Sequence, residues 1–432
     1  MVIKKTGVGN MKNLIAVLVL IVLVVFFNIS MAIAGGFLIY DHDAAATGMG
    51  LAYTAQVDRP SAVFYNPAAM SRLKGTSIST GGAIIIPRTT YRNPITGHET
   101  EMKHHTYFVP NFYVTHKIND KFAAGFGFFC PFGISTDWGD AWKEEGRFIS
   151  TFAEIRTYFL NPAISWQVHP RLSLAVGFDY VFSEVEMKRA INLSKEVGIP
   201  GLPEGRTKIE GDGEGQGFNL GLLYHVTKDI DFGMSYRSRI DIDYDGDAWF
   251  NIPATGIGII DASLANIFQN GDVSIDNIDL PSILVVGLST TMLKNWTFEF
   301  DFYWINWSTF NKISADFENP NTPDTIILRD WYDSLFYALG AKYQLNKSIV
   351  LRGGYMFRNT PIPSRTLDPI LPDSDSHLVN FGVGYQNKGL SIDLGYKAVF
   401  YNDRTTQTNI QGFNGTYESF ASLIAINLQY VF

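Results

Sequence analysis

The segment Trp296-Thr297-Phe298-Glu299-Phe300-Asp301-Phe302-Tyr303-Trp304 decides the fold class of this 432-residue chain. Side chains of a β-strand point alternately to opposite faces, so one face of this segment carries only aromatic rings and the other carries two carboxylates. The same alternation recurs along the chain, for example in residues 172–180, 230–237 and 420–432. The pattern predicts an all-β protein whose strands have one apolar and one polar face.

Alternation alone fits two architectures. In a soluble β-sandwich the apolar faces form the core, whereas in a transmembrane antiparallel β-barrel they contact lipid and the polar faces line the lumen. Connection lengths favour the barrel, because tight turns alternate with long segments along about fourteen strand candidates. The tight turns include Asn119-Asp120 and His169-Pro170, and the long segments include 132–149, 190–213, 251–279, 311–333, 359–375 and 402–415. This sorting is typical of outer-membrane barrels, whose turns lie in the periplasm.

The end of the chain points the same way. Tyr430 and the terminal Phe432 place aromatic rings on one face of the last strand. A final strand that ends on an aromatic residue is typical of barrels folded by the outer-membrane assembly machinery. We therefore expect these two residues to serve barrel assembly.

The N-terminus predicts export. Lys4, Lys5 and Lys12 precede an apolar stretch at 14–27, and Ala32-Ile33-Ala34 offers small residues where a signal peptidase cuts. We expect residues 1–34 to be a signal peptide, with translation starting at Met1 or Met11 and the mature chain starting at Gly35. A retained membrane anchor is the alternative, although the stretch is short for a bilayer.

Charge and cysteine content exclude several partners. The chain has 34 Lys and Arg against 42 Asp and Glu, and loss of residues 1–34 removes three lysines and no acid, which leaves a net charge of −11. Such an acidic protein gains nothing from nucleic-acid phosphates. The single cysteine, Cys130, excludes an internal disulfide and a cysteine-rich metal site.

The chain lacks the motifs of common hydrolases. No Gly-x-Ser-x-Gly or His-Glu-x-x-His pattern occurs, and the adjacent His104 and His105 would face opposite sides of a strand. We expect a protein that is not an enzyme and that holds no metal or cofactor. A general porin and an outer-membrane enzyme are the rival interpretations from other classes.

Residues 35–75 have no strand pattern and contain two helix starts. Asp41 and Asp43 precede Ala44-Ala45-Ala46, and Asn66 caps Pro67-Ala68-Ala69-Met70, where proline at the first helical position loses no needed donor. A barrel of about fourteen strands encloses more space than its inward side chains fill. We therefore expect residues 35–75, including Asn66, Pro67 and Ala68, to form a partly helical hatch inside the lumen of a barrel domain at 76–432. A periplasmic tail is the alternative, and an open porin would have no use for a hatch.

Several motifs resemble one family in order along the chain. Gly35-Gly36-Phe37 and the stretches 45–53 and 61–70 resemble the opening of the FadL family of outer-membrane transporters. Further matches are Gly211-Asp212-Gly213-Glu214-Gly215, Ser235-Tyr236-Arg237-Ser238, Leu280-Pro281, Trp304-Ile305-Asn306-Trp307-Ser308 and Leu371-Pro372-Asp373. The resemblance implies a fourteen-stranded barrel with an N-terminal hatch. It also implies passive diffusion of long-chain fatty acids or, alternatively, of aromatic hydrocarbons of the toluene type.

The resemblance further implies a sideways exit into the membrane at a kinked third strand. That strand contains Phe129-Cys130-Pro131-Phe132-Gly133, where proline cannot donate to the ladder and glycine weakens pairing. We expect the exit at Phe129, Pro131 and Gly133. A plain strand end that leads into a loop is the alternative.

Two further features suit a hydrophobic ligand. Ile260, Leu264, Ile267 and Phe268 share one helical face that could capture the ligand, or that packs against the loop at 190–213. For a carboxylate, the resemblance points to Arg189, whose guanidinium can bind it bidentately. A rim arginine that contacts lipopolysaccharide phosphates or nearby glutamates is the alternative. The expected partners are the ligand, outer-membrane lipid and lipopolysaccharide, and the assembly machinery, and we expect a monomer.

Overall fold

Fourteen antiparallel strands close into one barrel within residues 35–432, the part of the chain that our computed structural model describes. The first wall strand, β1 (Thr76–Arg92), pairs with the last, β21 (Gly415–Val431), from Ser77 opposite Val431 to Arg92 opposite Thr416. Closure matters in lipid because it satisfies backbone groups that an open sheet edge would leave unpaired. The fold class predicted from the sequence is confirmed, while the predicted signal peptide at 1–34 lies outside the described residues.

Several wall strands are interrupted and continue as a second piece. The remaining wall strands in chain order are β3 (Tyr107–Lys117), β4 (Phe122–Phe129) with β5 (Gly133–Asp137), β6 (Phe152–His169), β7 (Leu172–Ile191), β8 (Gly205–His225), β9 (Ile230–Arg237) with β10 (Asp243–Asn251), β12 (Ile283–Thr290) preceded by β11 (Gly271–Asp276), β13 (Trp296–Ile305) with β14 (Lys312–Phe317), β16 (Ser334–Gln344), β17 (Ile349–Arg358), β18 (Ser376–Asn387) and β19 (Leu390–Tyr401). Short elements in the long loops are β2 (Glu99–Glu101), β15 (Thr325–Leu328), β20 (Arg404–Thr406), α4 (Leu193–Val197), α5 (Gly258–Ile267) and the 3-10 turns at Glu145–Phe148 and Trp307–Thr309.

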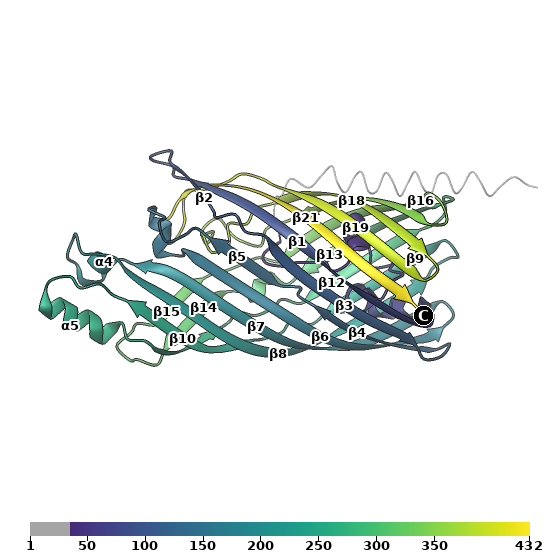
Figure 1. Ribbon diagram of the computed structural model, residues 1–432, viewed down its shortest axis with the longest axis horizontal. Helices are drawn as coiled ribbons and strands as arrows, with labels where there is room; N and C mark the ends of the chain where they lie inside the picture. Colours follow the sequence, from purple (N-terminus) through teal and green to yellow (C-terminus); the bar gives the residue numbers. More distant parts are fainter. Residues whose placement is uncertain (1–34) are drawn as a thin grey trace, which may run out of the picture. The chain divides into compact units, whose positions relative to one another are not determined.

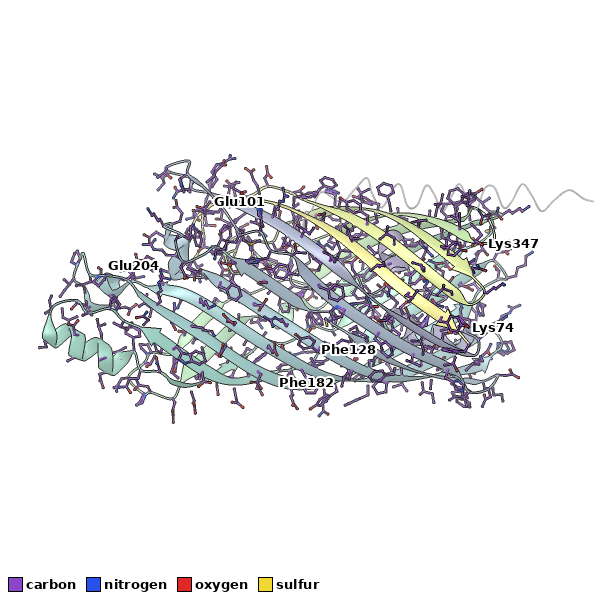
Figure 2. The ribbon with its side chains drawn as sticks, in the orientation of Figure 1. Lys74, Glu101, Phe128, Phe182, Glu204 and Lys347 are labelled. Carbon is purple, nitrogen blue, oxygen red and sulfur yellow. The ribbon has the colours of Figure 1, made fainter. Side chains whose placement is uncertain are left out.

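The apolar face of the wall points outward. Phe108 and Phe381 are 62% and 59% exposed, whereas the carboxylates of Asp179, Asp301 and Asp393 are fully buried on the inner face. Figure 2 shows Phe128 and Phe182 midway along the wall, with charged residues labelled toward its two ends. This polarity is the reverse of a soluble sandwich and fits a wall that contacts lipid. No helix in residues 35–432 is long and apolar enough to cross a bilayer.

Tight turns and long loops lie at opposite ends of the barrel. In Figure 1 the C-terminus marks the end with the tight turns, and α4 and α5 lie at the other end. The loops predicted at 132–149, 190–213, 251–279, 311–333 and 402–415 are partly wrong. The beginning of β8 at Gly205 shortens one of them, and β5, β11, β14, β15 and β20 lie within the others. The glycine-rich residues 211–217 therefore lie inside β8, and residues 206–214 pair with β10.

Residues 35–75, the hatch, lie inside the wall and contain α2 (Ala44–Gly48), α3 (Ala62–Tyr65) and a 3-10 helix (Pro67–Arg72). The predicted caps are present: Asp43 accepts from the Ala45 N–H at 2.7 Å, and Asn66 accepts from the Ala68 N–H at 3.2 Å. Glycines on the inner face of the wall make room for the hatch backbone. A Cβ added to Gly382 would lie 2.9 Å from the Cα of Gly48 in the hatch.

Candidate ligand passage

Carboxylates on the wall hold the backbone of the hatch. The N–H groups of Tyr53 and Thr54 donate to Asp301 at 2.9 and 3.0 Å, and those of residues 55–56 donate to Glu299 at 2.5 and 3.0 Å. Both acids lie on the polar face of the segment that predicts the fold, so their alternation with aromatic rings places them in the lumen. Buried carboxylates are stabilised by such donors, which replace the lost water.

Ion pairs fasten the hatch to several different strands. They join hatch and wall at widely separated points of the barrel and involve Asp41 with Lys397, Arg59 with Asp393, Asp58 with Lys342, and Arg72 with Asp231. The predicted hatch residue Asn66 adds a bridge, because its Nδ2 donates to the carbonyls of Thr54 and Leu222 at 2.9 and 3.0 Å. Pro67 and Ala68 are buried beside it.

The wall is interrupted where the third strand breaks. Below the break, β4 pairs with both β3 and β6. Above it, residues 107–111 of β3 pair with β1, residues 133–137 of β5 pair with β6, and no pairing joins these two segments in the described chain. We call the gap between them the window. Pro131 thus separates two strand pieces, so the alternative of a plain exit into a loop is wrong.

The hatch lies along the inner side of this break. The Ile39 N–H donates to the Pro131 carbonyl at 2.8 Å, and the Gly133 N–H donates to the Phe37 carbonyl at 3.0 Å. Leu38 and Phe132 form an isolated antiparallel bridge between these bonds. The segment that turns away from β3 therefore satisfies its backbone groups on the hatch.

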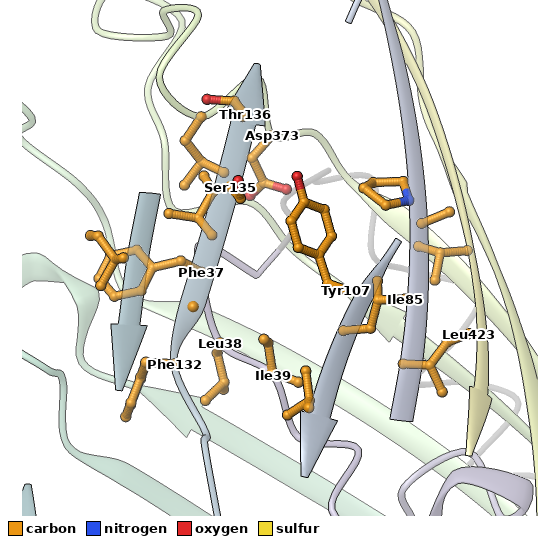
Figure 3. A pocket seen from close by; sticks show the side chains of 18 of the residues that line it. Phe37, Leu38, Ile39, Ile85, Tyr107, Phe132, Ser135, Thr136, Asp373 and Leu423 are labelled. Atoms are coloured by element: carbon orange, nitrogen blue, oxygen red, sulfur yellow. The ribbon is translucent and has the colours of Figure 1, made fainter. Parts of the chain in front are cut away.

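A cavity of about 350 Å³ borders the window. It is lined by lumen-facing side chains such as Ile85 and Leu423 and also by the lipid-facing Phe108 and Phe420. The lining therefore includes both residues whose side chains face the lumen and residues whose side chains face lipid, next to the unpaired stretch of the wall. Figure 3 shows side chains from the hatch, β1, β3, β5 and β21 around it.

One end of the cavity is polar. Asp373, on the loop between β17 and β18, accepts from the Gly36 N–H at 3.0 Å and from the Thr360 hydroxyl at 2.8 Å. Burial raises the pKa of Asp373, and nearby Arg358 opposes that shift. Arg358 is half-buried, lines the cavity and forms no ion pair within residues 35–432, although its Nε donates to Ser376 Oγ at 3.3 Å. An otherwise apolar cavity whose polar end carries a guanidinium without an ion pair in the described residues suits an amphipathic anion.

Arg189 lies elsewhere. It lines a second cavity of about 250 Å³ near the loop end of β7, with Arg147, Lys188, Arg206 and Lys208. The main cavity does not include it. The structure therefore separates Arg189 from the window, and its role in carboxylate binding stays a prediction.

The predicted capture face on α5 is largely covered. Leu264 is fully buried against Ile191 and Leu193, so the packing alternative holds for it and it is not available to a ligand in this arrangement. Phe268 is half-buried, with its ring centroid 5.4 Å from that of Phe250. Ile267 is also half-buried, and capture by it and Phe268 stays a prediction.

Of the residues predicted for the exit, Phe129 and Pro131 are buried and Gly133 is half-buried beside the hatch. Sequence reasoning missed Arg358 and Tyr107, which line the cavity. Arg358 ends a wall strand and Tyr107 begins one, and neither position shows a local pattern that distinguishes a cavity residue from a rim residue. His104 and His105 precede β3 and do not lie on a strand.

A closed barrel with an occupied lumen and a window in its wall defines a class of outer-membrane transport proteins. Residues 25–432 match the family model described as outer membrane protein transport protein (OMPP1/FadL/TodX), and the chain belongs to this family. The hatch motifs at 35–37, 45–53 and 61–70 are among the features on which the resemblance in the sequence rests.

Sequence and structure relatives agree with this assignment. The chain is 24% identical to long-chain fatty acid transport proteins of Escherichia coli and of Salmonella typhi, with 90% of this chain and 93% of each relative covered. Its fold is similar to that of a Pseudomonas aeruginosa FadL homologue, with a TM-score of 0.83 at 20% identity over 92% of this chain and 99% of the other. The Ralstonia pickettii toluene transporter TbuX gives a TM-score of 0.70 at 19% identity over 91% of this chain and 100% of the other.

Proposed function

We propose that the chain lets hydrophobic small molecules, long-chain fatty acids first, diffuse passively through the hatch-filled barrel and leave sideways through the window into the membrane. The observation that carries this proposal is the cavity that borders the break between β4 and β5, where β3 and β5 are not paired and where residues that face the lumen and residues that face lipid both line it. Each buried CH₂ group stabilises the bound state by about 0.8 kcal/mol, so a ligand that moves from cavity to lipid avoids the cost of crossing water.

The guanidinium of Arg358, which lies at the polar end of the cavity and forms no ion pair within residues 35–432, supports a fatty acid as the ligand. The guanidinium of Arg358 can bind the carboxylate of a fatty acid while the acyl chain of the ligand lies along Phe132, Ile85 and Leu423. Aromatic hydrocarbons are the second candidate. They are supported by the aromatic lining of the cavity and by the similarity to a toluene transporter, and they need no cation.

The remaining expectations attach to this function as proposals. Ile267, Phe268 and Arg189 would act at the loop end, and Phe129, Pro131 and Gly133 at the window. Outer-membrane lipid and lipopolysaccharide would surround a monomer. Assembly by the outer-membrane machinery would use Tyr430 and Phe432, whose ring centroids lie 4.8 Å apart at the barrel seam, where the Phe432 N–H donates to the Thr76 carbonyl at 2.8 Å.

Uptake of labelled oleate and labelled toluene, in cells that lack their own transporter, tests the proposal. We expect the chain to speed oleate uptake and Arg358→Gln to lower it about tenfold, since a hydrogen bond to a charged group contributes about 1.5–3 kcal/mol. Toluene uptake should not respond to Arg358→Gln. Arg365→Gln is the matched control, because Arg365 is an exposed arginine that pairs with Asp330 outside the cavity.

Two outcomes contradict the proposal at different points. If neither compound enters faster with the chain than without it, hydrophobic transport is wrong. If Pro131→Ala transports at the wild-type rate, the break at Pro131 is not needed for the exit.

A further inference from the structure

The upper end of the window is bridged by a short piece of chain. Residues 102–103 cross from β1 to β5: the Met102 N–H donates to the Thr89 carbonyl at 2.9 Å, and the Lys103 N–H donates to the Asp137 carbonyl at 2.8 Å. The window is therefore framed on all sides, by β3, β5, the paired part of β4 and this crossing segment. Its size depends on how firmly the crossing segment is held.

In addition to the backbone hydrogen bond from Lys103, the side chain of Asp137 contacts Lys103 in the crossing segment and His105 just after it. Its Oδ1 lies 3.1 Å from Lys103 Nζ and its Oδ2 lies 3.0 Å from His105 Nε2, while the Gly139 N–H donates to Oδ1 at 2.9 Å. We call the contacts of Asp137 with Lys103 and His105 the clamp. Lys103 and His105 are 57% and 43% exposed in their side chains, so water competes for both contacts and each is individually weak.

Tyr107 lies in the opening below the clamp. Figure 3 shows its ring between β3 and β5, with the hydroxyl pointing toward Ser135. Tyr107 and Ser135 both line the cavity, so a ligand that leaves through the upper window has to pass them. Phe108, the next residue, is already on the lipid face.

The strand on the far side of the clamp is a small element. β5 has five residues, pairs with β6 alone, and is separated from β4 by the break at Pro131. Besides β6, it contacts the hatch, where the Gly133 N–H donates to the Phe37 carbonyl at 3.0 Å, and the loop between β17 and β18. In that loop the Ile370 carbonyl accepts from Thr136 at 3.1 Å, and the Pro369 carbonyl accepts from Trp138 at 2.9 Å. At this height the clamp and a side-chain hydrogen bond between Tyr107 and Ser135 tie β5 to the β3 side, and no backbone pairing joins the two strands in the described chain.

We propose that the clamp is the moving part of the exit: release of Asp137 from Lys103 and His105 lets β5 move away from Tyr107 and widens the window while the ligand passes. This inference rests on the proposed lateral exit and assigns positioning residues to it. Lys103, His105 and Asp137 do not bind the ligand. They set the width through which it leaves.

A reversible lock tests the clamp. Lys103→Cys with Asp137→Cys, in a Cys130→Ala background, places two thiols on backbones joined by a direct hydrogen bond, within the usual reach of a disulfide. We expect the oxidised protein to take up oleate about tenfold more slowly than the same protein after reduction, because a gating motion is then blocked. Comparison within one protein cancels the loss of the native side chains. Equal rates before and after reduction overturn the inference.

The control lock joins two strands whose pairing is continuous. Leu351→Cys with Val383→Cys, in the same background, links directly opposed lipid-facing residues of β17 and β18. Its uptake should be the same when oxidised and reduced, since no motion is expected there. If oxidation lowered oleate uptake by the control protein as much as by the clamp variant, oxidation itself would be the cause. That result would also overturn the inference.

Hydrogen exchange at the Lys103 amide gives a measurement that needs no transport. In the purified full-length barrel, oleate should speed this exchange about threefold, because clamp opening breaks the bond to the Asp137 carbonyl, and Asp137→Asn should speed it without oleate. If the exchange rate of the Lys103 amide changes neither with oleate nor in Asp137→Asn, the clamp does not move, even if uptake occurs. Absence of uptake by the wild-type chain would instead overturn the proposed transport.

Discussion

At the scale of single residues, glycines on the inner wall decide how closely the hatch can approach. A Cβ added to Gly354 would collide with the backbone of residues 49–50 in the hatch, whereas a Cβ added to the neighbouring Gly353 would meet nothing within 4 Å. The two positions share a strand and differ only in the face they present. They form a matched pair for testing the contact.

We expect Gly354→Ala to push the hatch from the wall and to lower the free energy of unfolding by about 1–3 kcal/mol, the usual cost of overpacking. The barrel should then lose its heat resistance on gel electrophoresis at a lower temperature. Gly353→Ala should behave as wild type. Equal effects of the two substitutions would mean that the hatch does not rest on Gly354.

Local residue patterns were predictable where the cause is local. The caps at Asp43 and Asn66, and Pro67 after the second cap, depend only on neighbouring residues, and all three are confirmed. Arg358 was not predictable, because its importance comes from the loop at 359–375 and the hatch meeting around it. Leu264 has the helical spacing of a capture face but is buried by α4, which no spacing rule can reveal.

At the scale of elements, the loop between β17 and β18 folds back against the hatch and carries three buried acids, Asp368, Asp373 and Asp375. Burial raises the pKa of Asp375 to about 6, with Arg404 opposing the shift, and burial raises the pKa of Asp373 as well. Because an exposed aspartate titrates at about 3.9, the packed loop binds protons more tightly than the released loop between about pH 4 and 6. The contribution of these raised pKa values to the stability of the packed loop is therefore fully present below about pH 4 and is lost as the pH rises through about 6.

We therefore expect the loop at 359–375 to exchange its amide hydrogens faster at pH 7 than at pH 4.5, after correction for the intrinsic pH dependence of exchange. Asp375→Asn should remove most of this difference, since the asparagine cannot ionise. Protection that grows with pH in the wild-type chain would contradict the sign of the shift.

Some strands that were not predicted, such as β10, lie toward the loop end of the barrel (Figure 1). β10 carries Asp243, Asp245 and Asp247 on its outer face, so the outward apolar row that identifies a membrane strand is missing there. The pairing of β10 with β8 and β11 nevertheless extends the sheet. A row of outward-facing apolar side chains identifies a strand only in the part of the barrel that contacts lipid.

At the scale of the whole barrel, the buried contacts of the hatch predict a wall that does not conduct ions freely. Glu299, Asp301 and the four ion pairs hold the hatch across the lumen. We expect the purified protein to give little steady conductance in planar bilayers, and a variant lacking residues 38–73 to give larger currents. Persistent porin-like currents from the intact chain would contradict a hatch-filled barrel.

The barrel and the sorting of turns and loops were predictable because alternation and connection length report them directly, and the helix starts at 35–75 came from local capping residues. The path through the wall was not. The break at Pro131 predicts a weak point in one strand, but the window also needs residues 107–111 to lack a partner on that side, and only the assembled wall shows this.

The seam between β1 and β21 has a consequence for the order of folding. The hatch immediately precedes β1, and the partner that closes the wall over it is the last strand of the chain. Pairing between chain ends of such high sequence separation forms late, because a long loop must close first. The hatch can therefore fold while the wall is still an open sheet, and the last strand then encloses it. In a chain truncated before Gly415, β1 would lack its partner and the wall could not close around the hatch. Closure of the barrel therefore depends on the final strand having been made.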